Sequence, residues 1–188
     1  MEQPKQVAFL GLALLLAVAG FVFPAIRAAM EYPQKKWDCA MNLRQLGLAL
    51  HMYAGDHKER FPDRLEEIAE SEYAKQTDLL ICPSSDPEVF SKASDWSRIG
   101  SSNTCYYYVA GGAKKIRPAN HVQMFCPPEM HKGEGGYILF VGGYVKWLLV
   151  ESSEGETFWS QLRESGITPE MVAAATNRII HVDDLNLD

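Results

Sequence analysis

The sequence lacks the short motifs that identify common hydrolases, metalloproteases and redox proteins. It contains no G-x-S-x-G, no H-E-x-x-H and no C-x-x-C pair, and no serine, histidine and aspartate form a convincing catalytic set. No nucleophile with a neighbouring base can be identified either. The chain has no internal repeat and no low-complexity segment. The sequence therefore does not predict an enzyme.

The chain also lacks an excess of basic residues. Lysine and arginine number 18 against 24 acidic residues, for a formal net charge of −6, and the basic residues are scattered. Phosphate binding depends on clustered lysine and arginine, so a nucleic-acid partner is not expected. Hydrophobic residues make up 47% and charged residues 22% of the chain, which is the composition of a globular protein.

Charge is absent altogether between Val7 and Ile26. A run of about 20 apolar residues is long enough to cross a bilayer as a helix, and Arg27 stands where a signal-peptide cleavage site should be cleanest. We therefore expect residues 1–30 to be a transmembrane anchor and 31–188 to be one domain, with a cleavable signal peptide as the alternative. Basic residues on both sides of the run leave its orientation open. Four cysteines suit a disulfide-permissive compartment, so we predict a single-pass inner-membrane protein with its domain in the periplasm or outside the cell.

A helical stripe follows the apolar run. Leu43, Leu46, Leu50 and Tyr53 recur at intervals of three and four, which predicts a helix that seats one face on a core. Gly55 can end this helix, while Pro24 and Pro33 should kink or briefly break the preceding part. A second helix is expected over 63–74, capped by Asp63 with Glu66 reaching back.

The rest of the chain predicts a small antiparallel sheet and two short helices. Strands are expected over 78–82, 104–110 and 122–126, followed by a hairpin over 136–150 in which Gly142 and Gly143 form a type I′ turn. Helices are expected over 157–165 and 168–178. The fold class is α+β. The side chains expected to pack the sheet are Ile138, Phe140, Val145 and Trp147.

A few histidines, cysteines and acids could bind metals. His121, Cys126 and His131 surround a Pro-Pro turn and could hold zinc, although H-x4-C-x4-H is not a recurrent zinc spacing, and loop histidines beside a buried cysteine are the alternative. Asp86 and Glu88, with Asp95, could hold calcium but lack the alternating pattern of a calcium-binding hand. Structural disulfides are expected among the cysteines, including Cys82, Cys105 and Cys126, with the pairing left open.

Three segments in the right order carry a family resemblance. They read CAMNLRQLGLALHMYAGDHKERFPD, LLICPSSD and HKGEGGYILFVGGYVKWL. The sequence resembles the pilin-like proteins related to protein G, the major pseudopilin of type II secretion, in the form found in planctomycete- and verrucomicrobium-type bacteria. Gly142-Gly143 replaces the family's usual Asp-Gly turn. The family's N-terminal processing signal and assembly glutamate are absent, so the resemblance implies the fold more strongly than filament assembly.

This resemblance implies a structural or accessory subunit of a secretion or pilus-like apparatus that acts through protein–protein surfaces. The expected partners are the membrane, through the N-terminal helix, and other pilin-like subunits or apparatus components. The alternative is a free-standing anchored binding module with carbohydrate as a candidate ligand, since sugars stack on aromatic side chains. Two observations favour that alternative: the missing assembly glutamate, and five aromatic residues, which are Trp96, Tyr106, Tyr107, Tyr108 and Trp147.

Overall fold

The computed structural model describes residues 3–70, 73–74, 76–96, 99, 102–110, 117–153, 155–175, 178–181 and 185; the side chains of 3–17, 70 and 110 lie outside this description. The chain divides into two compact units, residues 1–35 and 36–188. Helix α1 (Gln3–Asp56) runs through both and includes Pro24 and Pro33 without a break. The helix ends where the sequence places its end.

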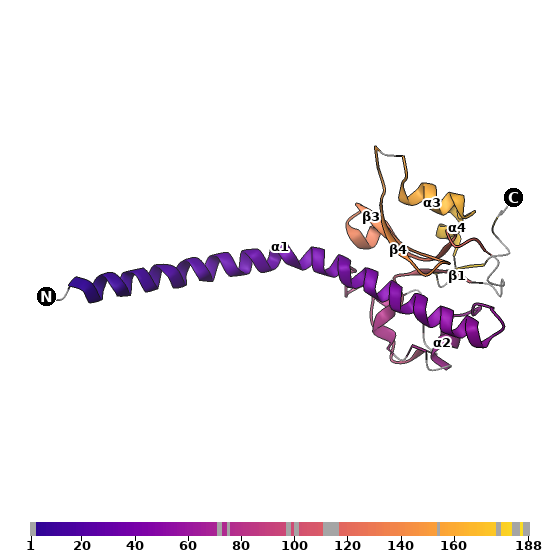
Figure 1. The fold of residues 1–188 in the computed structure, drawn as a ribbon, viewed down its shortest axis with the longest axis horizontal. Helices are drawn as coiled ribbons and strands as arrows, with labels where there is room; N and C mark the ends of the chain where they lie inside the picture. The colour runs from indigo at the N-terminus through magenta and orange to yellow at the C-terminus, as the bar shows by residue number, and fades with distance from the viewer. Residues whose placement is uncertain are drawn as a thin grey trace. The chain divides into compact units, whose positions relative to one another are not determined.

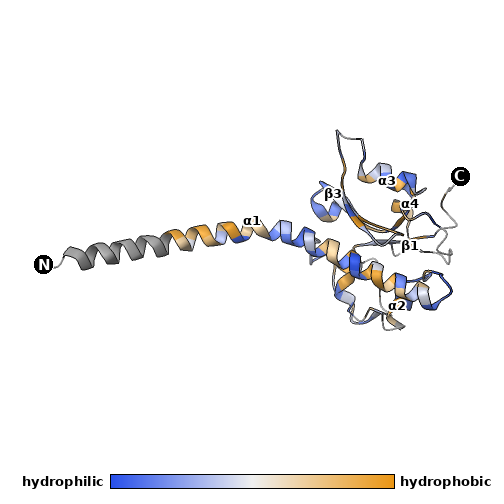
Figure 2. Ribbon diagram, viewed as in Figure 1, coloured by the Kyte–Doolittle hydropathy of each residue, from blue (hydrophilic) through white to orange (hydrophobic). Residues whose placement is uncertain are grey.

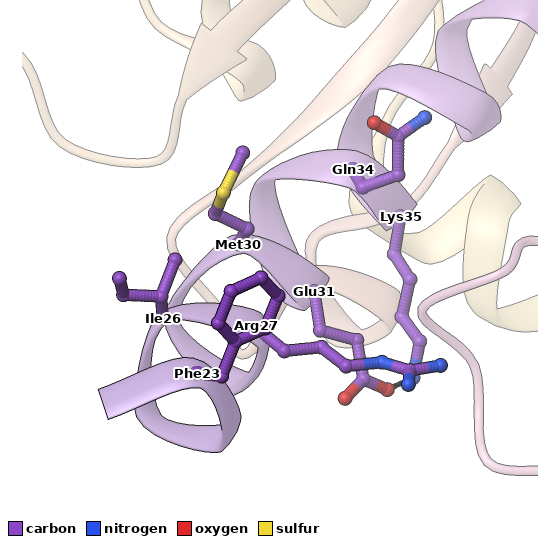
Figure 3. A pocket seen from close by; sticks show the side chains of 7 residues that line it. All are labelled: Phe23, Ile26, Arg27, Met30, Glu31, Gln34 and Lys35. Carbon is purple, nitrogen blue, oxygen red and sulfur yellow. Dashed lines mark ion pairs between the residues drawn. The ribbon is translucent and has the colours of Figure 1, made fainter. Parts of the chain in front are cut away.

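In the first unit the described part of α1 changes from apolar to charged. The apolar side chains from Val18 to Ile26 are exposed, and Arg27, Glu31 and Lys35 follow, with the Lys35 Nζ 2.7 Å from Glu31 Oε1 (Figures 2 and 3). Among the residues with described side chains, no helix has both the length and the apolar character needed to cross a membrane. The predicted single-pass inner-membrane localisation is therefore wrong. The side chains of residues 7–17, the earlier part of the apolar run, are not among those described.

The second unit is built around one mixed sheet (Figure 1). Its five strands lie in the order β4-β3-β2-β1-β5. The strands are β1 (Tyr107–Ala110), β2 (Val122–Cys126), β3 (Gly135–Phe140), β4 (Val145–Leu149) and β5 (Ile179–His181). Strands β1 to β4 pair antiparallel, while β5 lies parallel to β1 with Val109 opposite Ile180. The prediction of a purely antiparallel sheet is therefore wrong, because residues after 178 return to the sheet as an edge strand.

Both faces of the sheet are covered. Residues 36–56 of α1 pack on one face, and helices α3 (Phe158–Glu164) and α4 (Pro169–Ala174) lie over the other (Figure 1). Successive side chains of a strand point to opposite faces, so Leu139 joins the core under α1 and Ile138 joins the core under α3. The structure is thus α+β, with a long helix on a small sheet and short C-terminal helices, as the sequence predicts.

The stripe on α1 is buried in the first core. Leu43, Leu46 and Leu50 have no exposed surface, and Tyr53 is also buried. On the sheet, Ile138 and Phe140 belong to the second core. Val145 is half-buried against the first core, and Trp147, on edge strand β4, is half-buried as well.

Three local predictions need correction. Residues 78–82 are not a strand: Thr77–Leu80 form the 3-10 helix η1, since a short apolar run before a proline fits either element. Helix α2 covers only Glu66–Glu70, and its start is capped by Glu67, whose Oε1 accepts from the backbone amides of Asp63 and Arg64. Helix α4 ends at Ala174 with Ala175 as its C-cap, so it is shorter than the predicted helix, of which residues 176 and 177 lie outside the described part of the chain.

The β3–β4 hairpin forms where it is expected, but its turn differs from the predicted type I′. A type I′ turn needs a positive φ at both central residues, and of the two glycines only Gly143 has one, at +83°. The Gly143 amide donates to the Phe140 carbonyl at 2.8 Å, and the Phe140 amide donates to the Tyr144 carbonyl at 3.0 Å. The connection is therefore a three-residue loop that ends on a left-handed glycine.

Candidate metal centre

Four potential metal ligands converge in the core under α1. The Sγ atoms of Cys39, Cys82 and Cys126 and a ring nitrogen of His131 all lie within 4.8 Å of one another, and all four residues are buried. They come from α1, from the turn after η1, from the end of β2 and from the 3-10 helix η3 (Pro128–His131). The fold thus joins four separate segments at one point.

Cys39 is placed by the same periodicity that buries the leucine stripe. It precedes Leu43 by four residues, so it occupies the same face of α1, and it has no exposed surface. The side-chain amide of Asn42 lies one turn further on and donates to the Ile81 carbonyl at 3.1 Å. This bond ties the segment that carries Cys82 to the helix that carries Cys39.

The Cys82 segment is also fixed from its other side. The amide of Cys105 donates to the Leu80 carbonyl at 2.9 Å, and the Ser85 hydroxyl donates to the Cys82 carbonyl at 2.7 Å. Since Cys82 lies between these anchored residues, its sulfur is held toward the core.

Cys126 and His131 are brought together by the tight helix between them. Cys126 is the last residue of β2, and Pro127 and Pro128 lead into η3. The Met130 amide donates to the Pro127 carbonyl at 3.1 Å, which curls the chain back on itself. His131 therefore returns beside the strand end that carries Cys126.

One pair of ligand atoms has the spacing of a tetrahedral metal site. Zinc bound to thiolate at about 2.3 Å and to imidazole at about 2.0–2.1 Å sets neighbouring ligand atoms about 3.6–3.8 Å apart. The Cys82 Sγ lies 3.7 Å from Nε2 of His131. Three thiolates and one imidazole are also one of the standard structural zinc ligand sets. The cluster is therefore a possible metal site by both geometry and chemistry.

The electrostatics of the cluster favour a thiolate at Cys82. Hydrogen bonds from the Cys126 and Cys39 thiols hold the pKa of the Cys82 thiol well below its usual range, and His131 contributes in the same direction. Burial raises the pKa of Cys39 and of Cys126. A bound cation would have to displace protons from these two thiols, because a metal binds thiolate rather than thiol.

Aromatic side chains line the outer side of His131. The Tyr137 and Trp147 rings each make a T-shaped contact with the imidazole, with centroid distances of 5.6 and 5.2 Å. The Nζ of Lys36 lies 3.6 Å from the centroid of a Trp147 ring and 3.5 Å from Oε2 of Glu134. The four ligand residues are themselves buried, and burial strengthens electrostatic interactions within the cluster.

Of the three predicted zinc ligands, two lie in the cluster. The structure brings Cys126 and His131 together but leaves His121 out of the cluster, and it adds Cys39 and Cys82. The signal that could have found Cys39 is its position on the buried stripe of α1. No comparable sequence pattern places Cys82 in the cluster, since the sequence predicts a strand for its segment.

The expected disulfides are not supported. All four cysteines, including Cys105, are buried free thiols. The predicted calcium ligands Asp86, Glu88 and Asp95 do not converge in the described part of the chain. Asp86 instead accepts a hydrogen bond from the Glu88 amide at 2.8 Å, as acidic side chains do in turns.

The aromatic residues on which a carbohydrate-binding surface would depend are mostly inside the molecule. Tyr106 and Tyr108 have no exposed surface, and Trp96 is also buried. Tyr107 is half-buried and stacks on Phe125 with a centroid distance of 5.0 Å. The buried rings are not available to stack on a sugar.

Comparisons with protein-family models, with curated proteins and with solved structures found no match. The resemblance to pseudopilins, which depends on three sequence segments, stays a prediction.

Proposed function

We propose that residues 36–188 form a structural zinc domain in which Cys39, Cys82, Cys126 and His131 bind one Zn²⁺. The observation that carries this proposal is the convergence of the four ligand atoms within 4.8 Å in a buried core. Thiolate and imidazole are soft and borderline ligands that suit zinc, whereas calcium needs six or more oxygen ligands. The ligand set therefore favours zinc over calcium.

The role we propose for the metal is structural rather than catalytic. A catalytic zinc keeps one coordination position open for water or substrate, while a structural zinc is closed by four protein ligands. Here four protein ligands are available, and each is buried. The metal would join helix α1 to the sheet and to both turns beside it.

Metal analysis of the purified full chain tests this proposal. We expect one zinc per chain after purification or after reconstitution with zinc. Cys82→Ser should bind less than one zinc, while Cys105→Ser should keep full stoichiometry, because Cys105 is an equally buried thiol outside the cluster. Unsubstituted protein that retains no zinc after reconstitution would overturn the proposal.

We further propose that this zinc domain is a pilin-like structural or accessory subunit of a secretion or pilus-like apparatus. Support comes from the three sequence segments and from the packing of a long helix on a small sheet. The face of α1 turned away from the core also carries large exposed apolar side chains: Trp37, Leu48 and Met52 are 62%, 63% and 48% exposed. Such a face suits contact with another protein.

Photo-crosslinking in the native host tests the subunit role. A photoreactive residue at position 48 should capture another pilin-like subunit or apparatus component. The control position is Val89, which is 59% exposed in the loop after Cys82 and should capture no such protein. Crosslinking that is the same from both positions would contradict the proposal.

A further inference from the structure

The buried cluster has an aromatic hydroxyl beside one of its sulfurs. The Oη of Tyr106 lies 3.6 Å from Sγ of Cys39, at hydrogen-bond distance for a sulfur acceptor. Tyr106 has no exposed surface, and it lies directly before β1, on the sheet face that α1 covers. Its position is fixed by the core, so the contact is a built part of the site.

Charge explains why such a donor matters. Three thiolates and one neutral imidazole around Zn²⁺ carry a net charge of −1, and a buried charge is costly unless hydrogen bonds compensate it. A phenol has an ordinary pKa near 10 and is therefore a hydrogen-bond donor at neutral pH. Partners of metal ligands commonly orient the ligand and tune the affinity of the site for its metal.

We propose that Tyr106 is a positioning residue of the metal centre, whose hydroxyl donates a hydrogen bond to the Cys39 thiolate and stabilises the metal-bound state. This inference rests on the proposed zinc function and adds the residue that regulates affinity at that site. Tyr106 reaches the metal only through Cys39. The bond withdraws electron density from one sulfur, so it affects the metal's spectrum as well as its affinity.

The chain offers a closely matched control in Tyr108. Tyr108 lies two residues further on, on the same face of the sheet, and it also has no exposed surface. Its hydroxyl donates to the Pro62 carbonyl at 2.7 Å rather than to a sulfur. Tyr106→Phe and Tyr108→Phe therefore each delete one buried hydroxyl, but only the first deletes a bond to a ligand.

The experiment uses the full chain in three forms, unsubstituted, Tyr106→Phe and Tyr108→Phe. Each is loaded with Co²⁺ for absorption spectroscopy, and its zinc affinity is measured by competition with a chromophoric chelator. We expect Tyr106→Phe to bind one zinc with about 10- to 100-fold lower affinity and to shift the sulfur-to-cobalt charge-transfer band. Tyr108→Phe should match the unsubstituted chain in the band position and in zinc affinity.

The outcomes separate this inference from the zinc proposal. If the unsubstituted chain binds no zinc, both are overturned. If it binds zinc but Tyr106→Phe and Tyr108→Phe have the same band and affinity, the role of Tyr106 is overturned and the zinc centre stands.

A second measurement avoids substitution, in case Tyr106→Phe does not fold. In the full chain loaded with NMR-active cadmium, a through-bond correlation should join the metal to the Tyr106 hydroxyl proton. Its absence from a spectrum that shows the cysteine ligand correlations would overturn the role of Tyr106.

Discussion

Removal of the metal should destabilise the domain. The size of this effect follows from the positions of the ligands in the sequence. About 40 residues separate Cys39 from Cys82 and about 40 separate Cys82 from Cys126, and a cross-link that closes a loop of this length is worth about 4 kcal/mol. Two such loops give about 8 kcal/mol. Domains are commonly stable by about 5–15 kcal/mol, so we expect the metal-free domain to be marginally stable or unfolded.

Denaturant unfolding of the full chain, followed by circular dichroism, measures this effect in excess zinc and in excess chelator. Cys126→Ala removes a ligand and Cys105→Ala does not, although both cysteines are fully buried in the same core and lose the same atom. Cys105→Ala should keep the difference of about 8 kcal/mol between zinc and chelator, and Cys126→Ala should lose part of it, because the three remaining ligands bind zinc more weakly than four. Unfolding curves of the unsubstituted chain that coincide in zinc and in chelator would refute the reasoning.

Two further predictions concern helix packing and pH. A Cβ at Gly47 would lie 2.8 Å from Cδ1 of the buried Leu139, whereas a Cβ at Gly55 meets nothing within 4 Å. Gly47→Ala should therefore lower the free energy of unfolding by about 1–3 kcal/mol, and Gly55→Ala should raise it by up to about 1 kcal/mol. Denaturant unfolding measures both effects, and equal effects of the two substitutions would contradict this prediction. Burial raises the pKa of Cys39 and Cys126, so zinc must displace protons from both thiols and its affinity should fall as pH falls. Chelator competition at several pH values measures this, and an affinity independent of pH would contradict thiolate ligation at these positions.

The parts of the fold that follow from local periodicity could be predicted from the sequence. The leucines of α1 recur with the period of a helix, and the residues on both sides of Gly142-Gly143 have the character of strands. Strand β5 could not be found in this way, because three residues carry little pattern and their pairing with β1 joins segments about 70 residues apart. Likewise, the apolar run that ends at Cys82 fits a strand and a 3-10 helix equally well.

The metal centre shows the same limit. Cys126 and His131 lie five residues apart around a Pro-Pro turn, so their proximity could be expected from the sequence. Cys39 and Cys82 reach them only through the packing of α1 and η1 against the sheet, which no local spacing encodes. His121 belongs to the predicted zinc set because it is close to Cys126 in the sequence. Strand β2, however, separates the two residues, so His121 lies at the opposite end of the strand from Cys126.

X-ray absorption at the zinc edge of the full chain tests the central claim most directly. We predict three sulfur ligands at about 2.3 Å and one nitrogen ligand at about 2.0–2.1 Å. Cys39→Ser should lose one of the sulfur ligands. A zinc environment made mainly of oxygen and nitrogen ligands, or one that Cys39→Ser leaves unchanged, would contradict it.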